Sequence, residues 1–321
     1  MTDWTEEFLG VLFPAAPVPS EDGTKPDFKA LEKFASWTKT QPVDGVALWT
    51  DTGRGRNLSR EDRIAVLNIW RDALEDALPI VVEVGSDEGV PVESVVSSAI
   101  RNAQDAIPVA RYFLVRPPDE FRDDPDRDSR ILVYHRALAG FGIPLILSCG
   151  SDRSGNLFYS EEVLDTLMAM PEVAAVKTSM HDRPVLMQDL VTHILVKHPK
   201  KAVLSGEDRF YGYSLYRGCH GALVGLGSIC PELQREMIDA WFMRETSRFL
   251  QLSRLIDHLA EAIYVDPLDG HVGRILAGLA HKGIIPHGSS RDPWGPKLSP
   301  IDHEFVTATL DAVGEWSDVQ S

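Results

Sequence analysis

Eight short apolar runs, rich in β-branched residues and ended by turn residues, recur along this 321-residue chain. They occupy residues 10–15, 44–50, 79–85, 110–116, 143–149, 173–179, 201–207 and 221–227. Runs of this kind are typical of buried parallel strands, and one strand with its crossover helix needs about 30 residues. Since the runs begin 20 to 35 residues apart, the spacing predicts eight β–α units and hence an α/β fold, a (β/α)8 TIM barrel.

The segments between these runs carry apolar residues at helical spacing on one face, which predicts helices. The predicted helices span residues 27–38, 60–78, 92–106, 127–140, 161–170 and 184–198. Two of them begin with a recognisable capping pattern, Ser59 ahead of Asp62 and Ser160 ahead of Glu162.

The pattern changes after the eighth run. Residues 232–262 and 272–281 indicate long helices with no strand between them, and the Gly-, Ser- and Pro-rich tail 286–300 indicates an ordered surface loop. We therefore expect a barrel over residues 1–230 and a C-terminal helical extension over residues 231–321 that packs on it.

A doubly wound open sheet is the alternative fold, and it requires a glycine-rich turn after the first strand. Here residues 14–17 read Pro-Ala-Ala-Pro, so the barrel is favoured. In a barrel, the groups that carry chemistry lie at the C-terminal ends of the strands.

The composition excludes several classes of protein. There are 32 basic and 48 acidic residues, a net charge of -16, and no basic block, so we expect no nucleic-acid partner. No stretch approaches about 18 uninterrupted apolar residues, so we expect no membrane segment. Three cysteines without a C-x-x-C pair fit a reducing compartment, and we expect a cytoplasmic protein.

Familiar metal and nucleotide motifs are missing from the chain. It has no H-E-x-x-H and no G-x-x-x-x-G-K-[ST], so we expect neither a metal nor a cofactor. The loop 225–228 has two of the three glycines of a dinucleotide fingerprint, but late in the chain. It is either a backbone-amide site for an anionic group or an ordinary tight turn, and both interpretations stay open.

Lys177 is the strongest single candidate for a catalytic residue. It follows the apolar run 173–176, so we expect its side chain at the mouth of the barrel. Desolvation lowers the pKa of a lysine and frees its amine as a nucleophile toward ketones, which is the basis of Schiff-base catalysis. A solvated or ion-paired lysine is the alternative on position alone.

The order of several motifs resembles that of the dihydrodipicolinate synthase and N-acetylneuraminate lyase family. Gly23 and the segment 27–31 resemble the early "DG, then D-x-x-x-L" pattern, and Val176-Lys177-Thr178-Ser179 resembles the family's Schiff-base strand. Further matches are Asp44-Gly45-Val46, Thr52-Gly53, residues 58–63, Leu204-Ser205-Gly206-Glu207-Asp208, residues 218–221 with Pro231, and Arg291-Asp292-Pro293.

This resemblance covers nearly the whole chain, and it implies a (β/α)8 class I lyase that condenses or cleaves 2-oxo acids through a lysine imine. It implies that Lys177 is the imine-forming residue and that Thr52 and Gly53 bind the substrate carboxylate. It also places Ser179 at the substrate and Gly206 opposite the lysine. Family members are usually homotetramers, so we expect a homo-oligomer, a tetramer or a dimer.

The chain departs from the family pattern in its second-strand turn. Gly-Thr-Thr-Gly-Glu becomes Thr50-Asp51-Thr52-Gly53-Arg54. An ionised Asp51 beside the substrate would repel its carboxylate, so Asp51 must point elsewhere, pair with an arginine or act as an acid/base group. A surface turn aspartate is the alternative.

The proton relay departs further. The fifth-strand relay tyrosine falls on Ser148, whose hydroxyl is much less acidic than a phenol. The second relay tyrosine aligns with Leu114, and Tyr112 lies two residues earlier on the same strand face. Asp51, Ser148 and Tyr112 are therefore the candidate proton shuttles, although packing is an alternative role for Tyr112. Arg153 matches the synthase arginine that binds a distal carboxylate, with a solvated loop arginine as the alternative.

Three functions remain open. The first is a Schiff-base-forming lyase, an aldolase or dehydratase, acting on pyruvate-type 2-oxo acids or 2-keto-3-deoxy sugar acids. The second is a catalytically degenerate relative that binds a small carboxylic acid. The third is a phosphate-binding barrel enzyme without imine chemistry, which rests only on the loop 225–228.

Overall fold

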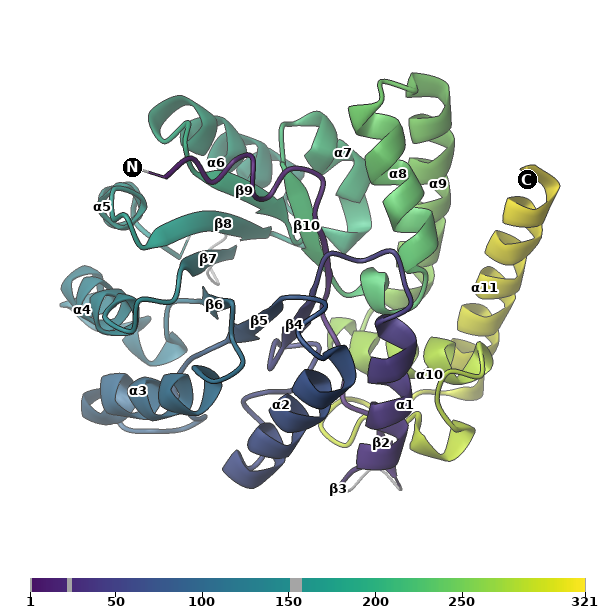
Figure 1. Ribbon diagram of the computed structural model, residues 1–321, viewed down its shortest axis with the longest axis horizontal. Coiled ribbons are helices and arrows are strands. Elements are labelled where there is room, and N and C mark those ends of the chain that lie inside the picture. The colour runs from purple at the N-terminus through teal and green to yellow at the C-terminus, as the bar shows by residue number, and fades with distance from the viewer. Residues whose placement is uncertain (1, 22–24, 151–157, 321) are drawn as a thin grey trace.

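The computed structural model describes residues 2–21, 25–150 and 158–320. Eight strands form one parallel sheet in the order β1-β10-β9-β8-β7-β6-β5-β4 (Figure 1). Each predicted apolar run coincides with one of them, and only β7 extends one residue past its run. The strands are β1 (Leu12–Pro14), β4 (Val46–Leu48), β5 (Ile80–Glu83), β6 (Tyr112–Val115), β7 (Leu145–Gly150), β8 (Val173–Ser179), β9 (Ala202–Ser205) and β10 (Gly221–Val224).

The sheet closes on itself between its first and last members. Beyond the end of β1, Ala15 forms a parallel bridge with Ala47 of β4, and the Ala16 amide donates to the Ala47 carbonyl at 3.0 Å. The predicted (β/α)8 barrel is thereby confirmed. A separate two-stranded hairpin, β2 (Ser20–Glu21) and β3 (Lys25–Pro26), lies outside the barrel sheet.

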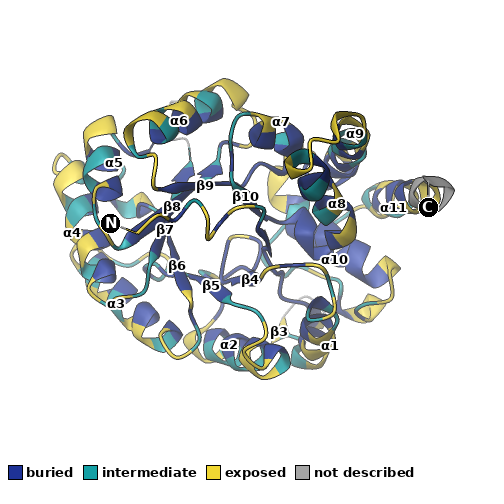
Figure 2. Ribbon diagram, turned by 45° about the horizontal axis from the view of Figure 1, so that its top comes forward, coloured by how far each residue is buried: buried dark blue, intermediate teal, exposed yellow. Residues whose placement is uncertain are grey.

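A ring of helices surrounds the barrel and turns its buried faces inward (Figure 2). These helices are α1 (Phe28–Thr38), α2 (Arg60–Leu74), α3 (Val95–Ala106), α4 (Arg127–Ala139), α5 (Glu161–Met168), α6 (Pro184–Lys197), α7 (Tyr211–Tyr216) and α8 (Pro231–Phe242). Both predicted caps are present, since the hydroxyl oxygens of Ser59 and Ser160 accept from backbone amides three residues on. Helix α2 ends before the predicted residue 78 because Glu75 and Asp76 adopt left-handed backbone conformations.

The C-terminal part is helical, as predicted, with α9 (Thr246–Ile263), α10 (His271–His281) and α11 (Pro300–Gln320). A left-handed Arg244 divides the predicted helical segment 232–262 into α8 and α9. The tail 286–300 is a loop with one short 3-10 turn, His287–Ser289, as predicted. Other 3-10 turns are Val92–Ser94, Asp119–Phe121, Asp208–Phe210, Leu226–Ser228 and Leu268–Gly270.

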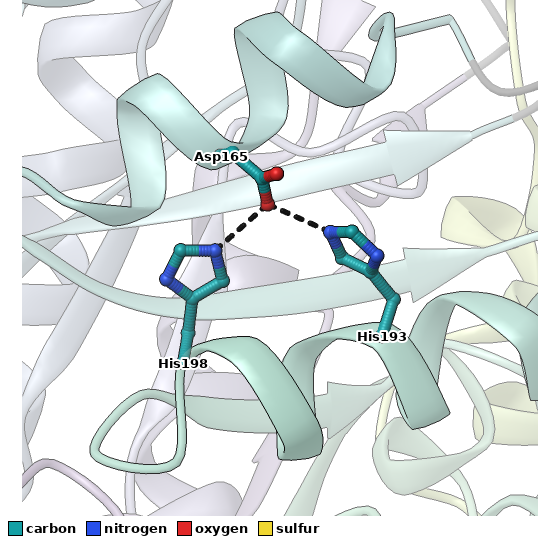
Figure 3. A group of neighbouring side chains, drawn as sticks. All are labelled: Asp165, His193 and His198. Carbon is teal, nitrogen blue, oxygen red and sulfur yellow. Dashed lines mark hydrogen bonds and ion pairs between the residues drawn. The ribbon is translucent and has the colours of Figure 1, made fainter.

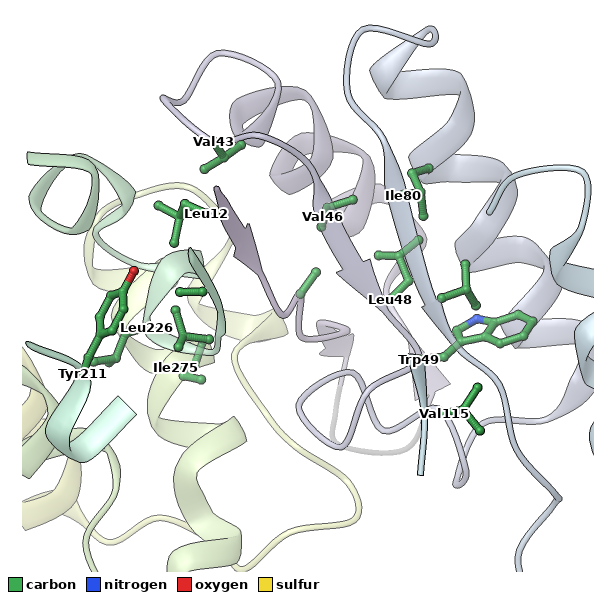
Figure 4. Close-up of a cluster of buried hydrophobic side chains, with 14 of the residues drawn as sticks. Leu12, Val43, Val46, Leu48, Trp49, Ile80, Val115, Tyr211, Leu226 and Ile275 are labelled. Atoms are coloured by element: carbon green, nitrogen blue, oxygen red, sulfur yellow. The ribbon is translucent and has the colours of Figure 1, made fainter. Parts of the chain in front are cut away.

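Two apolar layers hold the structure together. Residues that point outward from the strands, such as Val46, Leu48 and Ile80, pack against the surrounding helices (Figure 4). Residues of the opposite parity, such as Ala47 and Val81, fill the barrel interior. Among the described residues, no helix is long and apolar enough to cross a bilayer.

The N-terminal segment closes the lower end of the barrel. The Trp4 amide donates to the Lys200 carbonyl, and the Gly10 amide donates to the His220 carbonyl, and both acceptors precede strands. Trp4 and Phe8 join the interior cluster from this side. The opposite end, where the strands terminate, is therefore the one that remains open for a site.

Candidate functional site

A cavity of about 460 Å³ lies at the C-terminal ends of the strands. Strand ends and the loops that follow them supply most of its walls, and the segment that joins α9 to α10 supplies the rest. The lining residues used below are Thr50, Asp51, Thr52, Arg54, Glu83, Arg116, Asp119, Arg122, Ser148, Lys177, Ser179, His181, Gly206, Asp208, Gly225, Tyr264, Asp269 and His271.

The alternation of side chains along each strand explains why these residues face the cavity. Lys177 lies two residues beyond Ala175 of the barrel interior, and Glu83 two residues beyond Val81. The residues that face the barrel interior therefore change from apolar to polar toward the C-terminal ends of the strands. In β5 and β8, the first inward residue beyond the apolar layer is thus a charged one, and it carries the chemistry of this layer.

Lys177 extends from β8 into the cavity, and its Nζ lies 3.2 Å from the Ser179 hydroxyl. Ser148 of the neighbouring strand β7 is the register partner of Lys177 and lines the same cavity. The two candidate residues and the candidate Ser179 thus lie together. Opposite them, Gly206 follows β9 and also lines the cavity.

Gly206 leaves the room that Lys177 occupies. A Cβ atom at residue 206 would lie 2.6 Å from the Lys177 Cε and 2.1 Å from the Thr178 carbonyl oxygen. The Lys177 side chain could rotate away from such a Cβ, but the Thr178 carbonyl is backbone, so no side-chain rotation relieves that contact.

We expect Gly206→Ala to displace the Lys177 amine and to lower the unfolding temperature. Overpacking of this kind typically costs about 1–3 kcal/mol. Differential scanning calorimetry measures the loss, and Gly288→Ala, where no atom lies within 4 Å of the added Cβ, is the control that should leave stability unchanged. A Gly206→Ala protein as stable as the parent would contradict the close approach.

The second-strand turn brings Asp51 and Thr52 to the cavity, but not Gly53. The Gly53 amide donates to the Thr50 hydroxyl at 3.3 Å, and a Cβ at this glycine would lie 2.9 Å from the Ala16 carbonyl oxygen. Gly53 therefore supports the turn from behind the cavity wall. Arg153, the other predicted substrate ligand, lies outside the described residues.

Arg116 joins two carboxylates at the end of β6. Its Nη1 lies 2.9 Å from an Asp51 carboxylate oxygen, and its Nε lies 3.2 Å from a Glu83 carboxylate oxygen. Of the roles considered for Asp51, the structure therefore shows pairing with an arginine. Asp51 is 68% exposed to the open cavity, whereas Glu83 is 11% exposed.

The two carboxylates of this cluster titrate differently. Burial raises the pKa of Glu83 from 4.5 to about 7, because the opposing pull of Arg116 is smaller and the charge of Asp51 adds to the rise. The cavity walls also act to raise the pKa of Asp51, but Arg116 and Lys177 outweigh them and lower it. Near neutral pH, Asp51 is thus a fixed anion, while Glu83 is poised to gain or lose a proton.

Tyr112 lies away from the cavity. Its hydroxyl donates to a Glu7 carboxylate oxygen, and its ring packs on Phe8 at a centroid distance of 5.1 Å. Burial and the hydrogen bond to Glu7 raise the pKa of the phenol. Tyr112 is thus a packing residue at the N-terminal end of the barrel, so of the two roles considered for it the structure shows packing and not a proton shuttle.

The glycine loop after β10 is closed by a carboxylate of the protein itself. The amides of Gly225 and Leu226 donate to the Asp208 carboxylate at 3.3 Å and 2.8 Å. These amides are therefore occupied, which favours the tight-turn interpretation of this loop.

The C-terminal region forms the far wall. Tyr264 and His271 both line the cavity and stack at a centroid distance of 5.3 Å. Burial lowers the pKa of His271 to about 4, so its imidazole is neutral near pH 7. His181, two residues beyond the end of β8, also lines the cavity.

Arg54 forms ion pairs that connect the second-strand turn to the C-terminal region. It pairs with Asp292 in the C-terminal tail and with Asp269 at 2.7 Å. Its side chain is 10% exposed and that of Asp292 is 2% exposed. The pair joins two residues of the predicted motifs that lie 238 positions apart in the chain.

Sequence reasoning missed Glu83 and the pairing role of Arg116. The signal for Glu83 was present, because a lone carboxylate ends the apolar run 79–85 on the same strand face as Val81. It missed Tyr264 and His271 because they follow α9, and nothing in the local pattern shows that this segment returns to the barrel mouth.

Comparisons with known proteins add to this geometry. The model of the dihydrodipicolinate synthetase family matches residues 8–312. The chain is 25% identical over 291 residues to 4-hydroxy-tetrahydrodipicolinate synthase 1 of Streptomyces coelicolor, covering 90% of this chain and 88% of that protein. It is 24% identical to the N-acetylneuraminate lyase of Citrobacter koseri, covering 70% of this chain and 69% of that protein.

Solved structures are similar in fold. Dihydrodipicolinate synthase from Oceanobacillus iheyensis matches with a TM-score of 0.81 at 17% identity, covering 98% of this chain and all of that one. YagE of E. coli K12, a prophage protein solved in complex with pyruvate, matches with a TM-score of 0.81 at 16% identity, covering 96% and 99% of the two chains.

Proposed function

Because the chain belongs to the dihydrodipicolinate synthetase family, we propose that it is a lyase that forms a Schiff base between Lys177 and a 2-oxo acid. The observation that carries the proposal is the Lys177 amine inside a cavity at the mouth of a (β/α)8 barrel, beside the Ser179 hydroxyl. Relatives named as a synthase and as a lyase support the same chemistry.

The first step needs only groups that line the cavity. The Lys177 nitrogen attacks the keto carbon, the carbonyl oxygen leaves as water, and a C=N bond forms. In a C–C cleavage, the protonated imine then accepts the electron pair of the bond that breaks. In a dehydration, it accepts the electron pair of the C3–H bond whose proton is removed, and the resulting enamine expels the neighbouring hydroxyl, which leaves with a proton as water. Thr52, which is buried at the cavity wall, holds the substrate carboxylate with neighbouring backbone amides.

In this proposal, Glu83 accepts the proton that the family's relay tyrosine, replaced here by Ser148, would transfer. It lines the same cavity as Lys177, Arg116 orients it, and its pKa of about 7 suits a general base at neutral pH. Asp51 stays ionised on the other side of Arg116 and holds the guanidinium in place. Ser148, the register partner of Lys177, contributes a hydrogen bond rather than a titrating group.

The charges around the cavity favour a substrate with one carboxylate and several hydroxyls. Among the described lining residues, each arginine already pairs with a protein carboxylate: Arg54 with Asp269 and Asp292, Arg116 with Asp51 and Glu83, and Arg122 with Asp119. A second substrate carboxylate would meet these anions, whereas substrate hydroxyls would donate to them. We therefore propose a 2-keto-3-deoxy sugar acid, cleaved or dehydrated, over a dicarboxylic 2-oxo acid.

Borohydride trapping tests this function. The protein is incubated with pyruvate, a panel of other 2-oxo acids and 2-keto-3-deoxy sugar acids, then reduced and mapped by mass spectrometry. We expect a reduced adduct on Lys177, because borohydride fixes an imine as a stable amine. If folded protein forms no adduct with any of these acids, the lyase proposal fails.

A catalytically degenerate relative is the second candidate, and Ser148 at the family's relay-tyrosine position is the observation that favours it. The same experiment separates the two. An adduct on Lys177 without release of product from any member of the panel indicates a binder that retains the imine and has lost turnover.

A further inference from the structure

A cluster of two histidines and a carboxylate lies between two helices of the outer ring (Figure 3). Asp165 comes from α5, His193 from α6, and His198 from the residue that caps the C-terminus of α6. The Nε2 atoms of His193 and His198 lie 2.7 Å and 2.9 Å from the same Asp165 oxygen, Oδ1.

The cluster is remote from the catalytic cavity. Helix α6 leaves the mouth of the barrel after β8 and returns to the lower end, where β9 begins at Ala202. His198 lies at the end of this return, and none of the three side chains lines the cavity.

We propose that Asp165, His193 and His198 bind a divalent transition-metal ion, with zinc as the best match. Imidazole nitrogens with one carboxylate oxygen are a ligand set that Zn²⁺ favours, with a water molecule in the fourth position. The three ligand atoms lie within 4.8 Å of one another. Bonds of about 2.0–2.2 Å to a tetrahedral ion require edges of about 3.4 Å, so rotation of these side chains suffices.

The surroundings prepare the carboxylate for this role. Lys197 donates to the other Asp165 oxygen, Oδ2, at 3.0 Å, and to Glu161 at 2.8 Å. This contact fixes the carboxylate and leaves Oδ1 for the histidines, as the outer partners of metal ligands commonly do. The charges of Asp165, Glu161 and Lys197 sum to -1, which favours a cation.

The exposure of the three side chains fits the same role. The side chains of His193, His198 and Asp165 are 20%, 14% and 30% exposed, so the cluster is sheltered but open to a water ligand.

The ion would tie α5 to α6 and would not take part in the lyase reaction. Because the three ligands converge only in the folded chain, binding adds to the stability of the fold.

Thermal unfolding and calorimetric titration of the full chain with ZnCl2 test the proposal after removal of bound metal with a chelator. We expect one zinc per chain and a rise in Tm of about 5 °C at zinc a hundredfold above Kd. His193→Ala and His198→Ala should each remove most of this rise. Asp165→Asn, which keeps the size and a hydrogen-bonding oxygen, should weaken binding at least tenfold.

The matched control is His281→Ala. His281 Nε2 pairs with Asp311 Oδ1 at 2.7 Å, as in the cluster, but no second histidine joins that pair in the described structure. This variant should keep the full zinc response. As a second readout, Co²⁺ should give the visible absorption bands of a low-coordinate site in the parent and not in the His193→Ala/His198→Ala double variant. A zinc response that persists in the double variant, or no response in the parent, overturns the proposal.

Discussion

Replacing Lys177 by alanine should abolish turnover, with kcat at least about 10⁴-fold below the parent. The side chain supplies the only lysine amine that lines the described cavity, and without it no imine can form. The measurement is steady-state turnover of whichever 2-oxo acid is trapped on the parent, with circular dichroism to show that the variant folds.

Lys177→Arg is the matched control for charge. Its guanidinium keeps the positive charge beside Ser179 but is not a nucleophile at neutral pH. We expect this variant to be as inactive as Lys177→Ala. A Lys177→Ala protein that keeps more than about one hundredth of the parent's kcat would show that the reaction proceeds without the imine.

Glu83→Gln should lower kcat by about 10²- to 10⁴-fold. Glutamine has the same size and can still accept from the Arg116 Nε through its carbonyl oxygen, but it cannot take a proton. In the parent, the base form of Glu83 appears as the pH rises through about 7, so activity should rise over that interval. The variant should lose this rise.

Glu120→Gln is the control for the Glu83 experiment. Glu120 also pairs with an arginine, Arg56 at 2.9 Å, but it does not line the cavity. We expect its pH–activity profile to match that of the parent. A rise near pH 7 that survives in Glu83→Gln would assign the titration to another group.

The same pKa has a consequence for stability. The pKa of Glu83 in the folded state, about 7, lies above its ordinary value of 4.5. The stabilisation from binding this proton is therefore complete below about pH 4.5 and is lost as the pH rises through 7, on the order of 3 kcal/mol. Between pH 5 and 8, the unfolding temperature should fall less in Glu83→Gln than in the parent.

The barrel was predictable because strand spacing and helical periodicity are local signals that repeat eight times. Lys177 was predictable for the same reason, since its strand position and the order of surrounding motifs are both visible in the chain. The distance between strands is not a local signal. Sequence shows Glu83, Arg116 and Asp51 at three strand ends but not that one guanidinium contacts both carboxylates.

Tyr112 shows the limit of reasoning from parity. Parity places it on the inner face of β6, but a displacement of two residues moves a side chain about 6.6 Å along a strand. That step takes the phenol from the cavity into the aromatic cluster with Phe8. The depth of a residue in a barrel depends on how neighbouring strands are staggered. The local pattern of one strand does not encode that stagger, so sequence alone does not fix the depth of Tyr112.

The contacts that complete the cavity join parts of the chain that are synthesised far apart in time. The barrel closes only when β10 pairs with β1, and Arg54 gains Asp292 only after 238 further residues have been added. Such non-local contacts make folding slow, and an emerging chain exposes unpaired strand edges until they form. A ribosome-bound intermediate that includes β10 but ends before residue 292 should therefore contain Lys177 and most of the barrel yet lack the finished cavity. The reactivity toward 2-oxo acids that we propose should then arise late in synthesis.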